Sequence, residues 1–242
     1  MPKLVSETTV QEISAGRGRL KSPRAAAIAG ILFAILFSIS LGIIRYTLPN
    51  SIGNQQATAE ISANAGLRGL ALTLVPFSGI AFLWFIGVMR DRLGSLEDQL
   101  VSTVLFGSGL LFLGMIFVSA AIAGVVIATF DVSSNLKIQD DVVNFGRMIS
   151  FTITNVYAVR MAGVFMMSSG TLWIRTGVMP RWLALFTYGL ALILLFLPGL
   201  SLWTTMAFPF WVFVISIFIL VRRPLSVTDK SQQVESGSGE EH

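Results

Sequence analysis

Six long apolar runs divide this sequence, and they constrain its fold more than any other feature. Their ranges are 25–44, 69–89, 101–130, 148–173, 182–197 and 202–221. A transmembrane helix needs about 20 consecutive apolar residues to cross a hydrocarbon core roughly 30 Å thick, and the six runs approach or exceed that length. The sequence therefore predicts an all-α fold: a polytopic transmembrane helix bundle with six spans.

The composition also suits a surface covered by lipid. Hydrophobic residues make up 54% of the chain, charged residues only 12%, and the mean hydropathy is +0.76. A soluble domain has roughly 25% charged residues, because a large part of its surface faces water. We expect the lipid bilayer to be the main partner of this chain.

Lysine and arginine are distributed unequally between the two sides of the predicted spans. Twelve lie on one side, at Lys3, Arg17, Arg19, Lys21, Arg24, Arg90, Arg92, Arg175, Arg181, Arg222, Arg223 and Lys230. Four lie on the other side, at Arg45, Arg68, Lys137 and Arg147. Cytoplasmic loops carry the excess of positive charge, so both termini are predicted to be cytoplasmic.

This topology divides the chain into three parts. Residues 1–24 form a cytoplasmic tail, residues 25–223 form the six-helix transmembrane domain, and residues 224–242 form a cytoplasmic tail. The last segment is rich in Ser, Gln, Gly and Glu, which predicts disorder. Two loops of about 20 residues, 46–68 and 131–147, are expected on the other side. Pro198 and Gly199 predict a tight turn between the fifth and sixth spans.

Two residue types are nearly or wholly absent, and this excludes several kinds of chemistry. The chain has no cysteine, and its only histidine is His242. Thiolate nucleophiles, iron–sulfur clusters, thiolate zinc sites and imidazole-bound haem are thereby excluded, so we expect no metal, no cofactor and no catalytic residue. The pI near 9.9 does not indicate nucleic acid, because the positive-inside rule already accounts for the basic residues at helix ends.

Arg160 is the one charged residue deep inside a predicted span. A charge at that depth costs about 2.5 to 3.5 kcal/mol on insertion scales, so it should face the bundle interior or a wet cavity. No Asp or Glu lies at the same depth, which leaves carbonyls, hydroxyls, a lipid phosphate or a bound anion as partners. Tyr157, Gly163 and Thr171 share its helix face and complete a candidate anion or lipid site. The alternative is a structural arginine that bonds a neighbouring helix or snorkels.

Prolines and small residues give further expectations about the spans. Pro76 in the second run and Pro209 in the sixth each free a carbonyl one turn earlier, which predicts helix kinks. Such kinks either mark a gate or are ordinary features that neighbouring helices satisfy. Small residues in the third run predict close helix packing, with a pore lining as the alternative, at Gly107, Gly109, Gly114, Ala120 and Gly124. We therefore expect the third span at the centre of the bundle.

Two segments carry a resemblance to known sequences. They are FLWFIGVMRDRLG at residues 82–94 and RTGVMPRWLA at residues 175–184. Both resemble segments of a group of uncharacterised bacterial six-helix membrane proteins, and the PRWL boundary is similar to that of a domain-of-unknown-function family of similar length. The resemblance covers about a tenth of the chain. It implies a multi-pass protein of the bacterial inner membrane and carries no assigned activity.

Three classes of function remain open. The foremost is a non-enzymatic subunit or scaffold of a membrane complex, because the spans are nearly devoid of charge whereas a hydrophilic substrate needs a polar path. Its partners would be other membrane subunits or a second copy of the chain. The alternative is a transporter of a small solute or lipid, with an anion or anionic-lipid site at Arg160. An intramembrane enzyme comes third, because the spans lack general acid–base residues.

Overall fold

The computed structural model describes residues 23–47, 64–93, 99–132, 136–177, 179–197 and 204–221. All regular structure within these ranges is helical, which confirms the all-α prediction for the described part of the chain. The helices are α2 (Pro23–Thr47), α4 (Ala65–Leu93), α5 (Gln99–Val132), α6 (Leu136–Thr152), the π-helix η1 (Ile153–Ala158), α7 (Val159–Thr176), α8 (Arg181–Phe196) and α9 (Thr204–Val221). The Pro198–Gly199 turn, residues 1–22 of the N-terminal tail and the whole C-terminal tail lie outside the described residues.

In the part of the chain that the structure describes, five helical segments are long and apolar enough to cross a membrane. They are Ala25–Ile44, Gly66–Met89, Leu100–Val126, Asn144–Thr176 and Thr204–Val221. Helix α8 is apolar as well but has only 16 residues. These six segments overlap the six apolar runs of the sequence, because a helix that meets lipid on one side and apolar neighbours on the other has few places for polar residues.

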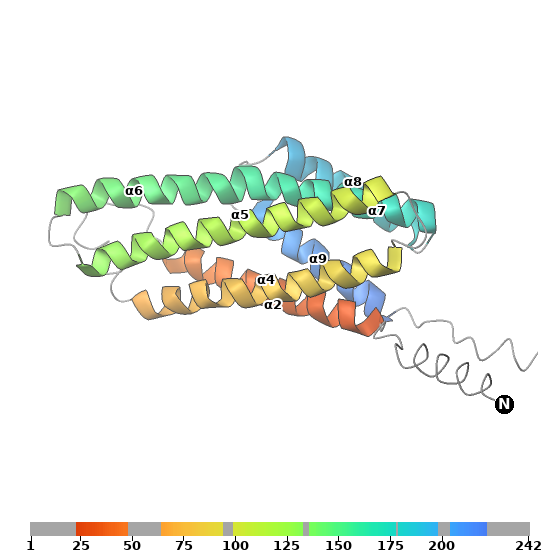
Figure 1. The fold of residues 1–242 in the computed structure, drawn as a ribbon, viewed down its shortest axis with the longest axis horizontal. Coiled ribbons are helices and arrows are strands. Elements are labelled where there is room, and N and C mark those ends of the chain that lie inside the picture. The colour runs from red at the N-terminus through yellow and green to blue at the C-terminus, as the bar shows by residue number, and fades with distance from the viewer. Residues whose placement is uncertain are drawn as a thin grey trace, which may run out of the picture.

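Two neighbouring helices extend well beyond the predicted spans. Helices α6, η1 and α7 follow one another without a break, and α5 runs alongside them; both project past the ends of α2 and α4 (Figure 1). The predicted loop over 131–147 is therefore wrong for most of its length, since α5 continues to Val132 and α6 begins at Leu136. An apolar window detects only lipid-embedded residues, whereas a polar segment without proline can continue a helix outside that window.

The helices pack in pairs. Helix α2 packs against α4, and α5 packs against the long helix made of α6, η1 and α7. Contacts between α4 and α5 join the two pairs, while α9 lies against α2 and touches α7. Helix α8 packs on α7 and makes few contacts with the rest. The bundle thus has a five-helix centre with α8 on its outside.

Stacked and edge-to-face rings fill the centre of the bundle. This aromatic core consists of Phe33, Phe37, Phe82, Phe85, Phe112, Phe165, Trp173, Phe208 and Trp211, all at most 3% exposed. Phe82 lies at its middle, with ring centroids 4.6 Å from Phe33 and 5.6 Å from both Phe165 and Phe208. Rings from α2, α4, α5, α7 and α9 therefore meet directly, and such pairs are stabilised beyond their buried area.

Of the four glycines predicted to pack closely on α5, only Gly109 does so very closely. A Cβ atom on Gly109 would lie 2.6 Å from Cδ1 of Ile86 and 3.2 Å from the ring of Phe165. Gly107 and Gly114 have open space at the same position, and Gly124 has only an ordinary contact with Leu72. The prediction of close packing at Gly107 and Gly114 was wrong. Both lie on an outward face of α5, so this helix is not surrounded on all sides.

Both prolines lie inside uninterrupted helices. Pro76 belongs to α4 and is exposed, whereas Pro209 belongs to α9 and is buried among the residues that face α2 and α7. Hydroxyls near Pro76 bond within the same helix: Ser78 donates to the carbonyl of Val75 at 2.7 Å, and Thr73 to that of Gly69 at 2.9 Å. The sequence predicted both prolines within helices, and each helix continues through its proline.

Candidate functional site

Arg160 is the second residue of α7 and follows directly after η1. Its side chain is half-buried, and Tyr157, one turn earlier, is 52% exposed. Among the described residues, no side chain or carbonyl forms a hydrogen bond or ion pair with the Arg160 guanidinium. A guanidinium has five N–H donors, so water, lipid or a ligand must satisfy those that the described helices do not.

Gly163 lies against α8, so the space above it is filled by protein. A Cβ atom there would lie 3.0 Å from Cγ of Leu195 and 3.1 Å from the carbonyl oxygen of Ala191. The small residue that the sequence assigned to the site therefore allows close approach of α8. Arg160 is one turn nearer to the start of α7 than Gly163 is. It must therefore lie level with the last residues of α8, because the two helices run in opposite directions.

Thr171 has partners of its own. Its hydroxyl lies 2.7 Å from the hydroxyl of Tyr188 on α8 and donates to the carbonyl of Met167 at 2.9 Å. At about 1.5 Å per residue it stands roughly 16 Å along the helix from Arg160. The structure thus keeps Arg160 and Tyr157 together, and it assigns Gly163 and Thr171 to the contact between α7 and α8.

A cluster of three hydroxyls lies between α5 and the start of η1, which the sequence did not single out. The hydroxyl of Ser119 on α5 is 2.7 Å from those of Ser150 and Thr154. Ser119 and Ser150 also approach each other's backbone carbonyls, at 3.0 and 3.1 Å. Three hydroxyl hydrogens and two carbonyls suffice to satisfy this hydroxyl cluster internally, so it ties the helices together without a ligand.

The next residue of η1 forms a second link, to α9. The side-chain oxygen of Asn155 accepts a hydrogen bond from the Thr205 hydroxyl at 2.7 Å, and its amide nitrogen donates to the carbonyl of Phe151 at 3.0 Å. In η1 the backbone N–H of Val159 bonds to the carbonyl of Thr154, five residues back. Such a π-helix widens the turn and is frequent at functional sites. Here Thr154 bonds to α5 and Asn155 bonds to α9.

A third interhelical link joins α8 to α9, nearer to Arg181. The indole nitrogen of Trp211 donates to the hydroxyl of Thr187 at 2.9 Å, and that hydroxyl donates to the carbonyl of Leu183 at 2.9 Å. Serine and threonine occur in most membrane helices, so their presence in an apolar run does not identify such links. Only the alignment of neighbouring helices does so.

Arg68 is a buried charge that the sequence placed in a loop. Helix α4 begins at Ala65, and the Arg68 side chain is 3% exposed in its first turn. Its backbone N–H donates to the carbonyl of Asn64 at 3.1 Å. The description of Arg68 as a loop residue was therefore wrong. In the described part of the chain, no three His, Asp or Glu residues come close enough to hold a metal ion.

The link between Asn155 and Thr205 can be tested by a double-mutant cycle. Asn155→Leu and Thr205→Val should each lower the free energy of unfolding by about 0.5 to 1.5 kcal/mol, because each leaves a polar partner unsatisfied. The double variant should lose less than the sum of the two, since the second change has no bond left to remove. Unfolding in mixed micelles measures all three.

Thr73→Val is the control for this cycle, because Thr73 is exposed and its hydroxyl bonds only within its own helix. It should leave the free energy of unfolding nearly unchanged. Strict additivity of the Asn155 and Thr205 losses would show that the two side chains do not interact.

No protein-family model, curated protein or solved structure matches this chain.

Proposed function

We propose that this chain is a non-enzymatic integral membrane protein that serves as a subunit or scaffold of a membrane complex. The aromatic core is the observation that carries the proposal. Rings from five helices close the middle of the bundle, and the polar groups of η1 bond to neighbouring helices. A bundle filled in this way offers binding surface on its outside rather than a polar path through its centre.

The proposal includes a topology of six spans with both termini in the cytoplasm of a bacterial inner membrane. Five long apolar helices, the shorter α8 and the unequal distribution of lysine and arginine support it. Reporter fusions test it directly. A reporter that is active only in the periplasm should be inactive after residue 230 and active after residue 60, and the opposite pattern at either position contradicts the topology.

Assembly is tested on the intact chain, purified in mild detergent at native expression level. A subunit or scaffold should migrate with a protein mass larger than the 26.2 kDa of one chain, with companions in fixed ratio or as a defined oligomer. A single monomeric species without such a companion, recovered in several mild detergents, would contradict the proposal.

A second candidate is a transporter of a small solute or lipid. The observation in its favour is that Arg160 has no partner among the described residues, close to the polar side chains of η1. Purified protein in liposomes should then move an anionic solute or lipid faster than empty liposomes do, and Arg160→Leu should abolish the difference. Equal rates with and without protein would exclude the transporter and leave the scaffold as the remaining proposal.

A further inference from the structure

The first step is the depth of Arg160 in the bilayer. One end of the bundle, here called the basic end, is where α2 begins, α4 and α7 end and α8 begins; it carries Arg24, Arg90, Arg175 and Arg181. Measured along α7, Arg160 lies roughly 22 Å from Arg175 at about 1.5 Å per residue. The hydrocarbon core is roughly 30 Å thick, so Arg160 lies about 8 Å short of the opposite boundary.

Polar side chains mark that opposite boundary independently. Asn155 lies roughly 30 Å from Arg175 along the long helix, and Ser119 lies roughly 28 Å from Leu100 along α5. Asn155 bonds to Thr205, which is in the first turn of α9. Helix α8 ends short of this level, beside Arg160, because Phe196 lies only roughly 22 Å from Arg181. The bonded amide and hydroxyls thus gather where three helices leave the hydrocarbon, and α6 continues outside it.

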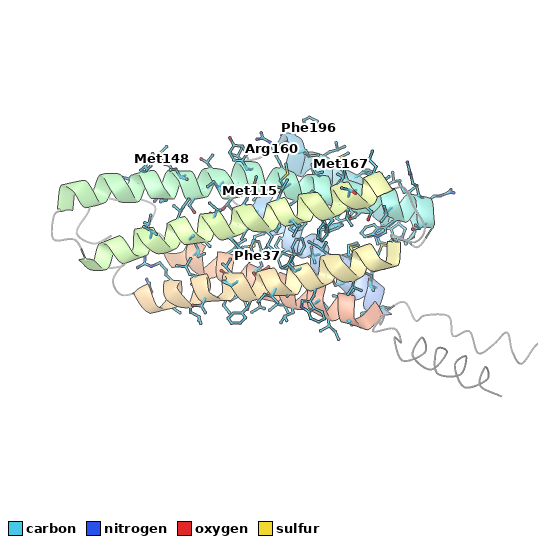
Figure 2. The ribbon with its side chains drawn as sticks, in the orientation of Figure 1. Phe37, Met115, Met148, Arg160, Met167 and Phe196 are labelled. Atoms are coloured by element: carbon cyan, nitrogen blue, oxygen red, sulfur yellow. The ribbon has the colours of Figure 1, made fainter. Side chains whose placement is uncertain are left out.

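The direction of the Arg160 side chain follows from helix geometry. Helix α7 runs towards the basic end, and Cα–Cβ bonds tilt towards the start of a helix, so the side chain leans towards the opposite boundary. A long arginine side chain can lie along apolar surface and bring its guanidinium to the level of the lipid headgroups. In Figure 2, Arg160 lies near Phe196, the last helical residue of α8, on the edge of the bundle away from Phe37.

The surroundings of Arg160 suit one end of a lipid molecule. Tyr157 lies one turn nearer to the boundary, and its hydroxyl is a further hydrogen-bond donor. On the other side α8 presents exposed apolar side chains at Leu192, Ile193 and Phe196, which are 45%, 48% and 79% exposed. Polar donors at the level of the headgroups therefore adjoin an apolar surface at the level of the acyl chains.

We propose that Arg160 binds the phosphate of a phospholipid in the leaflet opposite the basic end, with Tyr157 as a second donor and an acyl chain along α8. The planar guanidinium fork matches two phosphate oxygens, and no described residue competes for it. The proposal rests on the transmembrane placement given above, and it depends on neither assembly nor transport. The competing arrangement is a guanidinium bonded to the free carbonyls at the end of α8.

Because the chain has no cysteine, a single introduced thiol can report on this site. Phe196→Cys carries a fluorescent label beside Arg160, and Trp182→Cys, 64% exposed near the basic end, carries the same label as a control position. The probe is phosphatidylglycerol with a quencher on its acyl chain, added to protein in phosphate-free detergent. Diacylglycerol with the same quencher and glycerol phosphate without chains complete the set.

Phosphatidylglycerol should quench the label at position 196 at lower concentration than diacylglycerol does. Arg160→Leu should raise the half-saturating phosphatidylglycerol concentration about tenfold at that position and leave it unchanged at position 182, because only the former loses charged hydrogen bonds. Arg160→Lys should have a smaller effect, since it keeps the charge without the planar fork. Tyr157→Phe should raise the concentration by less than Arg160→Leu.

Three results would overturn the proposal. An equal half-saturating phosphatidylglycerol concentration for the wild type and Arg160→Leu would mean that the guanidinium bonds to the carbonyls of α8 instead. Equal quenching by diacylglycerol and phosphatidylglycerol would show a site for acyl chains alone, and displacement of the lipid by glycerol phosphate would show a site for small anions. The placement in the bilayer is tested separately. A thiol at Tyr157→Cys should react with a membrane-impermeant reagent, and failure to react would contradict the proposed depth of Tyr157 and Arg160.

Discussion

Replacing Phe82 with alanine should lower the free energy of unfolding by about 3 to 5 kcal/mol, the largest loss expected from a single substitution in this bundle. The Phe82 side chain is fully buried, and its ring lies within 6.2 Å of Phe33, Phe85, Phe112, Phe165 and Phe208, measured between centroids. Truncation would leave a cavity among side chains of five helices. Unfolding of the purified protein in mixed micelles measures the loss.

Phe77→Ala on the same helix is the matched control. Phe77 is 57% exposed and takes part in none of the ring contacts of the described residues. Its truncation removes the same atoms from the lipid-facing surface and should change the free energy of unfolding by less than about 1 kcal/mol. Equal losses for Phe77 and Phe82 would mean that the aromatic core does not hold the bundle together.

Replacing Gly109 with leucine should lower the free energy of unfolding by about 1 to 3 kcal/mol or more, because it overfills a packed interface. Ile86 can move the end of its side chain away from a new Cβ atom, but the ring of Phe165 is fully buried and has little room. The melting temperature of Gly109→Leu in detergent should therefore fall well below that of the wild type.

Gly114→Leu provides a control one and a half turns along the same helix. Nothing lies within 4 Å of a Cβ atom at Gly114, and the residue is exposed. Leucine favours a helix over glycine by up to about 1 kcal/mol, so this variant should melt at the wild-type temperature or above it. A large fall for Gly114→Leu would instead place that face of α5 in a contact between chains.

The sequence predicted well where the apolar helices lie along the chain. It predicted poorly which face of each helix packs against other helices. Runs of apolar residues show where helices meet lipid, and all six runs overlap helices of the structure. Gly109 and Gly114 could not be told apart in the same way. Lipid and protein interior are both apolar, so a membrane helix lacks the polar face that orients a helix in a soluble protein.

Arg160 illustrates a second limit of the sequence. The apolar run 148–173 places it at the centre of a span, whereas the placement proposed above puts it nearer to one boundary. The difference arises because the long helix begins at Leu136, and its polar side chains Ser150 on α6 and Asn155 on η1 belong to interhelical links. Arg160 and Tyr157 were predicted to share a face, and this much follows from helical periodicity alone.

The short length of α8 has a consequence for the surrounding lipid. Its 16 residues span about 24 Å, less than the roughly 30 Å of hydrocarbon that α2 and α4 can match. In the proposed placement, the annular lipids beside α8 must compress their chains, whereas those beside α2 and α4 keep their ordinary length. Hydrophobic mismatch is thus confined to one side of the molecule, and a thicker membrane would strain the boundary along α8 before any other.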